Sequence, residues 1–561
     1  MLATSDAILE LASKSFIGSL RRGSDGSKPQ SRRHDLMGDP ERRARQGGRM
    51  QRRLVYGRAA ITGVVSRDRA EVVEDGAVYA EDGRIVAVGT RADLRARYPD
   101  AEETGSSQWV LLPGLVNAHH HVGLTPLQLG SPDHPLELWF ASRLGARRPD
   151  LYLDTLYSAF EMIESGVTTV QHLHGWTPGT LEEVSEAANS VIRAYADIGM
   201  RASYSYAVRD QNRLVYGDDD AFTASLPTDL QPMMRQHFER ISLPLEDHFT
   251  LYEELRARHA AASRTAVQLA PANLHWCSDQ ALERLAEISA RDQVPLHMHL
   301  LETAYQKEYA RRRTRGSAVS HLQELGLLGP RMTLGHGVWL TEADLELIAA
   351  TGTCICHNCS SNLRLRSGVA PLNAFERRGI TVAIGMDEAG INDDRDMLQE
   401  LRMVLRQHRV PGMDDAVPTC PQVLRMATEH GAATTPFHTG VGRLEPGRAL
   451  DLFALDWSQV TDAFLDEEVP VVDAVVQRAK SGGVRLVIVE GETIYADGRF
   501  SRVDRDAVRR ELARDMARPW TAEEKERRRL GKAIFPHVKA FYDGYLDNEV
   551  REPFYRPSST T

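Results

Sequence analysis

Residues 114–123 read GLVNAHHHVG, an apolar run that ends in three consecutive histidines. The apolar part is typical of a buried β-strand, and alternate residues of a strand point to the same face. We therefore expect His119 and His121 on one face, with His120 as a spacer that points away. A single His-x-His pair is weak support for a metal site, so the interpretation depends on what other segments bring to the end of this strand.

The middle of the chain, residues 113–435, alternates short β-branched runs with segments whose apolar residues recur at i, i+3 and i+4, the helical period. Eight such strand–helix units predict an α/β fold, a (β/α)8 TIM barrel with its site at the carboxyl ends of the strands. The longest irregular insert, about 209–250, is expected to be a lid or substrate loop. The expected strands are 111–119, 167–172, 201–207, 265–270, 294–299, 331–336, 353–357 and 380–387.

Two strand-rich blocks, residues 54–112 and 436–503, flank the barrel. Both contain alternating apolar positions separated by turn residues, a β pattern. We interpret them as a small composite β-sandwich domain built from both chain ends. Residues 504–561 are expected to form a helical C-terminal extension. Residues 1–53, with twelve Lys/Arg against six Asp/Glu, are expected to be a disordered basic leader.

The composition argues against several classes of protein. The formal net charge of −10 gives no general reason to expect nucleic-acid binding. No apolar run approaches the ~20 residues that span a membrane, so we expect no membrane partner. Five cysteines in 561 residues argue against a disulfide framework and favour a cytoplasmic location. The expected partner is a small-molecule substrate, and the sequence leaves a homo-oligomer open.

Other expected strands also end in residues that bind metals. The fifth ends in PLHMHLLET, with His299 and Glu302, the sixth in TLGHG, with His336, and the eighth in VAIGMDEAG, with Asp387. Imidazole and carboxylate groups are good ligands for Zn²⁺ or Fe²⁺. Because a barrel gathers its strand ends on one rim and places the first and eighth strands side by side, we expect these residues to meet the histidines of the first strand.

A second cluster offers an alternative metal site. Residues 354–362 read CICHNCSSN, a Cys-x-Cys-x-x-Cys pattern with His357, which is similar to a structural zinc cluster. On a strand, however, Cys354 and Cys356 share one face, and cysteines commonly fill cores as small apolar residues. We therefore favour the histidine-rich strand ends as the metal site.

The strand ends belong to longer segments that resemble the amidohydrolase superfamily, in particular its mononuclear metal-dependent deaminase and chlorohydrolase branch (triazine, guanine and S-adenosylhomocysteine deaminase-like enzymes). The matching segments are LLPGLVNAHHH, MHLLET, LGHGVWL, SSNLRLRSGVAP, IGMDEAG and GVGRLEPGRALDLFALD, within roughly residues 54–500. The resemblance implies four metal ligands, His119, His121, His299 and Asp387. It also implies three catalytic residues, Glu302, His336 and Asp387. The fourth strand, AVQLAP, has no lysine for the carbamate of two-metal relatives, so one divalent metal is expected, Zn²⁺ first and Fe²⁺ as the alternative.

The resemblance implies hydrolytic deamination of a nitrogen heterocycle or amidine-like substrate. Glu302 would protonate a ring nitrogen, Asp387 would take a proton from a metal-activated water, and His336 would orient that water. The alternative is a hydrolytic dechlorinase or an amide/urea hydrolase on the same site, distinguished by its leaving group. A catalytically silent barrel would have lost a ligand or Glu302, and all are present.

The departures from the family pattern lie around the substrate. Ala272 stands where many relatives carry a substrate-contacting histidine, so Asn273 or His275 is expected to replace it. His174 and Asn362 are expected to line or shape the substrate site. The run MDEAGINDDRD is unusually acidic, and the segment SPDHPLELWFASRLGARRPD lacks the usual acidic residue after its tryptophan helix. Because none of these changes affects the metal ligands, the sequence predicts the chemistry but leaves the substrate open.

Overall fold

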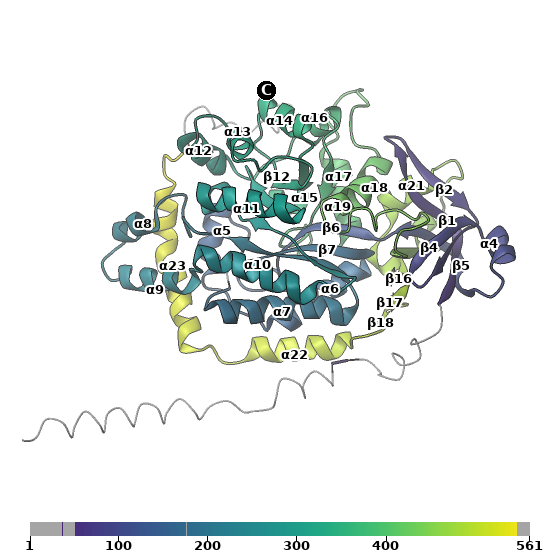
Figure 1. Cartoon of the computed structure of the whole chain (residues 1–561), viewed down its shortest axis with the longest axis horizontal. Coiled ribbons are helices and arrows are strands. Elements are labelled where there is room, and N and C mark those ends of the chain that lie inside the picture. Colours follow the sequence, from purple (N-terminus) through teal and green to yellow (C-terminus); the bar gives the residue numbers. More distant parts are fainter. Residues whose placement is uncertain (1–35, 38–50, 176, 547–561) are drawn as a thin grey trace, which may run out of the picture.

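The computed structural model describes residues 36–37, 51–175 and 177–546 (Figure 1). A β-sheet lies on the right of Figure 1, helices and parallel strands fill the middle, and the last two helices run along the lower and left edges. The disordered leader expected at 1–53 falls mainly on residues outside the described ones. Within the described ranges, no helix is both long and apolar enough to cross a membrane.

Strands from both ends of the described chain form one nine-stranded sheet, in the order β18-β17-β16-β15-β5-β1-β3-β4, with β2 paired to β1. Antiparallel pairing of β15 with β5, from Leu452↔Pro113 to Asp456↔Trp109, joins the two ends. The sheet is thus composite, while a second packed layer, as in a sandwich, stays a prediction. The strands of the nine-stranded sheet are β1 (Arg52–Ser66), β2 (Arg69–Glu74), β3 (Gly76–Glu81), β4 (Arg84–Thr90), β5 (Glu102–Pro113), β15 (Leu452–Asp456), β16 (Val484–Val489), β17 (Glu492–Ala496) and β18 (Arg499–Phe500).

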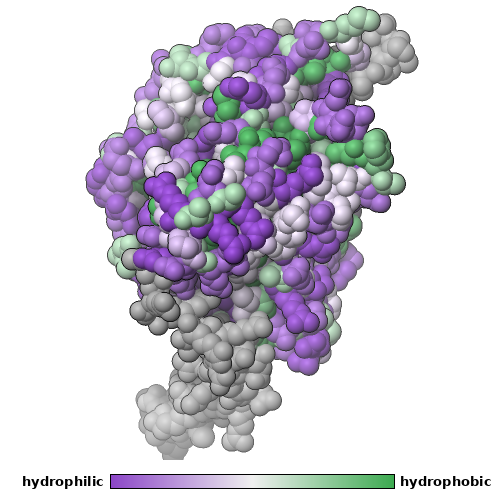
Figure 2. Space-filling view, turned by 90° about the vertical axis from the view of Figure 1, so that its right-hand side faces the viewer, coloured by the Kyte–Doolittle hydropathy of each residue, from purple (hydrophilic) through white to green (hydrophobic). Residues whose placement is uncertain are grey.

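The face of the molecule at this sheet end is mostly hydrophilic. Figure 2 shows it from the right-hand side of Figure 1, and hydrophobic residues occur there in small groups among hydrophilic ones. Such scattered apolar side chains are ordinary on a protein surface. The apolar faces of the sheet strands are instead buried, as for Val55, Val78 and Leu111.

Parallel strands form two arcs in the described residues, β10-β8-β7-β6 with β9 beside β8, and β11-β12-β13-β14. Isolated parallel bridges Leu269↔Leu296 and His120↔Asp387 join the arcs on both sides. With the short β9 and β10 taken as one interrupted strand, this is the parallel arrangement of a TIM-type barrel. The strands are β6 (Leu115–His120), β7 (Val167–His174), β8 (Arg201–Val208), β9 (Thr265–Val267), β10 (Ala270–Pro271), β11 (Leu296–Leu300), β12 (Met332–His336), β13 (Cys354–His357) and β14 (Val382–Ile384).

Helices follow the strands, and capping residues next to several of them in the sequence define where those helices begin and end. Thr180 and Glu183 form a capping box at the start of α7, and Gly199 ends it with φ 89°. Thr341 and Asp344 form the same box at the start of α14. The helices are α4 (Arg91–Arg97), α5 (Leu136–Arg143), α6 (Leu151–Glu164), α7 (Leu181–Ile198), α10 (Leu245–His259), α11 (Asp279–Asp292), α12 (Ala304–Arg313), α13 (Ala318–Glu324), α14 (Glu342–Thr351), α15 (Cys359–Arg364), α16 (Leu372–Arg377), α17 (Met397–Gln407), α18 (Cys420–Ala427), α19 (Glu429–Ala433), α20 (Trp457–Thr461) and α21 (Val471–Arg478).

The segment after β8 is helical rather than irregular. It contains α8 (Asp219–Ser225) and α9 (Gln231–Ile241). From Asp219 onward the expectation of an irregular segment over 209–250 is wrong, because side chains such as Phe222 and Phe238 pack into an apolar cluster separate from the main core, while the role of this segment as a lid or substrate loop stays a prediction. The same cluster includes residues of the C-terminal helix.

Two helices follow the composite sheet, α22 (Arg505–Ala517) and α23 (Ala522–Phe541). In Figure 1 α22 runs along the lower edge and α23 stands beside α8 and α9. Leu530 and Ile534 of α23 pack into the apolar cluster that also holds α5 and α9 side chains. The C-terminal helices therefore lie against the barrel, close to the insert after β8.

Candidate active site

The strand register brings the residues singled out in the sequence to one rim. His299 of β11 pairs with Gly335 of β12, next to His336. The bridge between His120 and Asp387 brings the segment after β14 to the end of β6. All these positions lie at or just beyond the carboxyl ends of parallel strands, which is where a barrel of this type places its site.

The backbone geometry lets the segment after β14 come close to the end of β6. His336 and Asp387 have positive φ angles of 71° and 55°, a region that non-glycine residues rarely adopt and that clusters at functional sites. A Cβ atom on Gly385 would lie 2.5 Å from the Cβ of His119 and 2.5 Å from Oδ1 of Asn358. Glycine at this position therefore lets the end of β14 approach β6 closely enough for Asp387 to reach the histidines.

Three histidines direct one ring nitrogen each into a common space. His121 Nδ1 donates to the Leu173 carbonyl oxygen at 2.7 Å, and His299 Nδ1 donates to a backbone carbonyl at 2.8 Å. His119 Nδ1 lies 2.8 Å from Nε2 of His297. Because hydrogen bonds engage Nδ1 in each ring, Nε2 faces the space between them, an arrangement typical of metal-binding histidines.

The Nε2 atoms and one carboxylate oxygen form a compact set of donors. Nε2 of His121 lies 3.0 Å from that of His119 and 3.1 Å from that of His299. Oδ1 of Asp387 lies 3.1 Å from His121 Nε2 and 3.6 Å from His119 Nε2. Zinc–nitrogen distances of ~2.0–2.1 Å imply donor separations of about 3.3 Å in a tetrahedron. The four donors, hereafter the donor set, therefore fit a single ion of this size.

The charges in the donor set also favour a cation. Burial, followed by the charges of neighbouring histidines, holds the pKa of His119 and His299 well below the usual value, so both rings are neutral. For His121 burial acts to lower the pKa, but the hydrogen bond and charge of Asp387 raise it above the usual value. The space between the Nε2 atoms and the carboxylate therefore attracts a proton or, in its place, a metal ion.

Two buried carboxyl groups in this site are held in opposite ionisation states. Burial, then the charges of Asp387 and Glu137, raise the pKa of Glu302 well above its usual range. For Asp387 burial acts upward, but the hydrogen bond and charge of His121 and the charge of His336 bring its pKa below the usual value. The surroundings therefore favour the protonated form of Glu302 and the charged form of Asp387, which is the requirement for separate acid and base roles.

Serine hydroxyls orient both carboxyls. Ser361 Oγ donates to Oδ2 of Asp387 at 2.6 Å, and Ser367 Oγ donates to Oε1 of Glu302 at 3.2 Å. Nε2 of His336 lies 3.6 Å from Oε2 of Glu302 and 3.7 Å from Oδ2 of Asp387. The two carboxyls and this imidazole therefore surround the same small volume next to the donor set.

Asparagine side chains hold His336 in place. His336 Nδ1 donates to Oδ1 of Asn362 at 2.8 Å, and Nδ2 of Asn358 lies 3.2 Å from His336 Nε2. Burial lowers the pKa of His336, so its ring is neutral. Asn362, singled out in the sequence for substrate binding, thus contacts His336 and shapes the site indirectly.

A cavity of about 400 Å³ opens onto the donor set. Its lining includes His121, His299, Glu302 and Asp387. Aromatic side chains form part of its wall, with the Phe140 ring centroid 5.2 Å from that of Trp139 and 5.1 Å from that of Trp276. Flat apolar walls with a few polar groups at one end suit a planar heterocycle.

The other residues expected to bind substrate lie in different places. His174 lines the cavity, and burial lowers its pKa to about 4, so its ring is neutral. Asn273 caps the short helix η1 (Leu274–Trp276), its side-chain oxygen accepting from the next backbone N–H at 2.7 Å. The His275 ring packs 4.0 Å from that of Tyr216. Neither Asn273 nor His275 is among the cavity-lining residues, so the geometry does not support substrate contact by them.

The cysteine pattern does not form one cluster. All five cysteines are free and buried. Cys356 Sγ lies 3.4 Å from Oδ1 of Asn358, whereas Cys359 Sγ donates to Oε1 of Gln407 at 2.6 Å. In the part of the chain that the structure describes, each group of clustered metal-ligating side chains contains at most one cysteine. One such group joins Cys359 to His357 and His408, but the cysteines of the pattern do not come together, so the geometry does not support a zinc site that uses all three of them.

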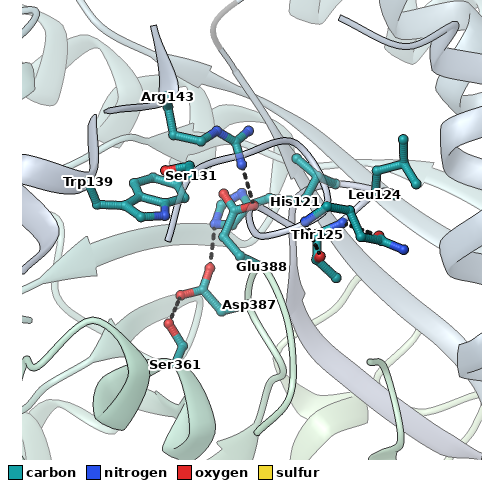
Figure 3. Close-up of polar contacts among 12 residues, drawn as sticks. His121, Leu124, Thr125, Ser131, Trp139, Arg143, Ser361, Asp387 and Glu388 are labelled. Carbon is teal, nitrogen blue, oxygen red and sulfur yellow. Dashed lines mark hydrogen bonds and ion pairs between the residues drawn. The ribbon is translucent and has the colours of Figure 1, made fainter. Parts of the chain in front are cut away.

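One ion pair beside the donor set was not predicted from the sequence. Nη1 of Arg143, on α5, lies 3.4 Å from Oε2 of Glu388, and both residues line the cavity. Figure 3 shows this pair next to the chain of contacts from His121 through Asp387 to Ser361. The sequence marks Glu388 only as an unusual acidic neighbour of Asp387, because its partner is 245 residues away.

The sequence model of the Amidohydrolase family matches residues 110–494, more than half of the chain. This chain belongs to the amidohydrolase family. A model of an imidazolonepropionase-like composite domain from bacteria also matches residues 76–101. The family match and the enzymes described next confirm the expectation of a metal-dependent hydrolase of aminohydrolase type, acting on carbon–nitrogen bonds, on an α/β barrel.

Relatives of assigned activity match most of the chain. A 5-methylthioadenosine/S-adenosylhomocysteine deaminase of Nitratidesulfovibrio vulgaris is 30% identical over 461 residues, 81% of this chain and 95% of that protein. The structure of an adenosine deaminase from Xanthomonas campestris with bound zinc has a TM-score of 0.70 at 25% identity, covering 82% of this chain and 97% of that one. An atrazine chlorohydrolase from Arthrobacter aurescens, complexed with zinc, has a TM-score of 0.71 at 21% identity, covering 82% and 99%, and is alike in fold.

Proposed function

We propose that this amidohydrolase is a zinc-dependent deaminase that releases ammonia from an amino-substituted heterocycle of the adenosine kind. The observation that carries the proposal is the donor set beside the buried Glu302, whose pKa burial raises, at the end of an aromatic-walled cavity. The deaminases of adenosine derivatives among the relatives support the substrate class, and the zinc in a deaminase of like fold supports the metal.

Four residues would hold the metal, His119, His121, His299 and Asp387. When bound, a divalent metal supplies a water of lowered pKa, ~7 instead of ~15.7. Zinc suits the separation of the donors, and Fe²⁺ takes the same ligand types.

The chain's own residues then account for the proton movements. Glu302 donates its proton to the ring nitrogen beside the carbon that carries the amino group, which makes that carbon electrophilic. Charged Asp387 takes a proton from the attacking water, and neutral His336, whose Nε2 carries no proton, accepts a hydrogen bond from that water and orients it. The carbon–nitrogen bond breaks, and the amino group leaves as ammonia with the proton from Asp387. The proton of the new hydroxyl returns to Glu302, so a carbonyl forms and both carboxyls regain their starting states.

The second candidate is a hydrolase that expels chloride or an amine through the same site. The fold likeness to the atrazine chlorohydrolase favours it, while the more similar relatives are deaminases. The leaving group separates the two candidates, because the attacking water and the acid are common to both.

Product analysis on the purified full chain tests the proposal. Metal content is measured first, and ammonia and chloride are then assayed with adenosine, methylthioadenosine, guanine and a chlorotriazine. We expect about one zinc per chain and ammonia from an adenosine derivative. Chloride without ammonia would select the second candidate, and a chain purified without metal that stays inactive after zinc or Fe²⁺ is added would contradict both.

Several coarser proposals concern the whole chain. We propose the division into a leader (1–53), a composite β-sandwich (54–112 with 436–503), a hydrolase barrel (113–435) and a C-terminal extension (504–561). We also propose a cytoplasmic enzyme with a small-molecule substrate and no nucleic-acid partner. A homo-oligomer is tested by sedimentation of the full chain.

A further inference from the structure

The wall of the cavity includes a residue from outside the segment that matches the family. That segment is 110–494, and α23 begins beyond it. Arg527 of α23 nevertheless lines the same cavity as the donor set. Arg148, in the loop between α5 and α6, and His237 of α9 line it as well. We call Arg148 and Arg527 the cavity arginines.

Helix α23 is packed firmly against the rest of the molecule. In Figure 1 α23 stands beside α8 and α9, and its apolar side chains lie in one cluster with those of α5 and α9. A Cβ on Gly531 would lie 3.2 Å from the backbone nitrogen of Gly145, so glycine permits the close approach of α23 to the end of α5. Just after α23, the Tyr542 hydroxyl accepts from the backbone N–H of Tyr216 at 3.1 Å. Arg527 is therefore presented to the cavity from a fixed element.

The acidic residues whose charges act on both cavity arginines, Glu523 and Glu524, already have partners. Glu523 pairs with Arg240 at 2.9 Å, and Glu524 pairs with Arg518 at 2.8 Å. Among the residues that the structure describes, no carboxylate lies within 4.0 Å of the guanidinium of either cavity arginine. Two positive charges thus face the cavity without an ion-pair partner.

The two unpaired positive charges of the cavity arginines affect the pKa values of the buried groups around them. Burial, followed by the charge of Arg527, lowers the pKa of Arg148 to about 10, so it stays charged at neutral pH. Burial and then the nearby arginines, Arg148 first, lower the pKa of His237 to about 4, so its ring is neutral. An anion placed here would offset the repulsion between the arginines and form charge-assisted hydrogen bonds.

The remaining arginines of the cavity are engaged elsewhere. Arg143 pairs with Glu388 at 3.4 Å, and the Arg209 guanidinium lies 3.6 Å from the Trp276 ring centroid. Arg147 lies 4.0 Å from the Trp520 ring centroid. The cavity arginines therefore differ from their neighbours in being available to a ligand.

We propose that Arg148 and Arg527 bind an anionic group, a carboxylate or a phosphate, on a substituent of the substrate's heterocycle, and that the C-terminal helix thereby selects the substrate. The planar guanidinium, with its fork of N–H donors, matches both kinds of anion. This inference rests on the proposed function, because it places the heterocycle at the donor set and its substituent toward α23.

Binding and turnover are measured separately on the full chain. Three compounds share the adenine ring: methylthioadenosine, which is uncharged, S-adenosylhomocysteine, which carries a carboxylate, and adenosine 5′-monophosphate, which carries a phosphate. Arg148→Gln and Arg527→Gln are compared with wild type and with Arg527→Lys, which keeps the charge. Arg529→Gln is the matched control, because Arg529 lies on the same helix, is exposed and does not line the cavity.

We expect both Gln variants to weaken calorimetric binding of one anionic compound by about ten- to hundredfold, the range for a charged hydrogen bond. Binding of methylthioadenosine should stay within about twofold, and Arg529→Gln should match wild type. The anion that loses affinity identifies the carboxylate or the phosphate as the group bound. Equal losses for charged and uncharged compounds, no loss for either anion, or no binding of either anion by wild type would overturn the inference.

The two proposals fail in different ways. Ammonia release from methylthioadenosine with unchanged binding of the anions in the Gln variants would leave the deaminase in place and remove the anion site. Arginine-dependent binding of an anion without ammonia from any compound would keep the anion site and remove the deaminase.

Discussion

Replacing Glu302 with glutamine isolates the acid role at the centre of the proposed mechanism. Glutamine has the shape of the protonated acid, which burial and the charges of Asp387 and Glu137 favour at this position. Its carbonyl oxygen can still accept from Ser367 Oγ, now 3.2 Å from Oε1. Glutamine has nearly the same volume as glutamic acid, so the substitution leaves no new cavity at this buried position. What disappears is the proton that Glu302 would donate to the substrate ring.

The expected loss follows from that single function. General acid–base catalysis contributes about 10²–10⁴-fold, or about 3–5 kcal/mol of the barrier. We therefore expect kcat of Glu302→Gln to fall by at least ~10²-fold, with little change in KM. Metal content should equal that of wild type, because Glu302 is outside the donor set. Ammonia release under saturating substrate, with elemental analysis of the same sample, measures both quantities.

Stability gives an independent check on the same residue. In the metal-free protein the raised pKa means that folding at neutral pH takes up a proton at Glu302. The native state then binds more protons than the unfolded one, so this group makes stability fall as pH rises from the unfolded pKa toward the folded one. Glutamine cannot ionise, so the variant lacks this pH-dependent loss of stability. The Tm of the metal-free variant at pH 7 should therefore be no lower than that of metal-free wild type. Activity within about threefold of wild type, or a clear drop in Tm, would refute the reasoning.

Three further substitutions test the donor set and its surroundings. His121→Ala should lose most of the bound metal, since it removes the donor that lies within 3.1 Å of the three others; elemental analysis showing full metal would contradict the ligand assignment. Gly385→Ala should lower the free energy of unfolding by about 1–3 kcal/mol, because its Cβ would lie 2.5 Å from that of His119; a wild-type denaturation curve would argue against the close approach. Cys359→Ala should keep both metal and activity, because Cys359 contacts Gln407 rather than the donor set, and loss of metal there would restore the cysteine cluster as a candidate.

Much of the barrel and of its donor set could be predicted from local pattern. Alternation of short apolar runs with helical segments predicts strands and helices, and parallel strands must gather their carboxyl ends on one rim. Because His119, His299 and Asp387 stand at the carboxyl ends of predicted strands, a barrel places them near one another, as the strand register shows. The segment 209–250 was not predictable in this way, because its helices depend on packing against α23, far along the chain.

The sequence by itself determined which residue types stand at each strand end, and so the kind of chemistry that this chain can support. Only the tertiary structure decided the surroundings of the substrate. It left Asn273 and His275 outside the cavity lining, joined Arg143 to Glu388, and brought Arg527 to the cavity from the C-terminal helix. The physical reason is that strand register follows from local periodicity, whereas contacts between segments hundreds of residues apart depend on how side chains of different helices pack.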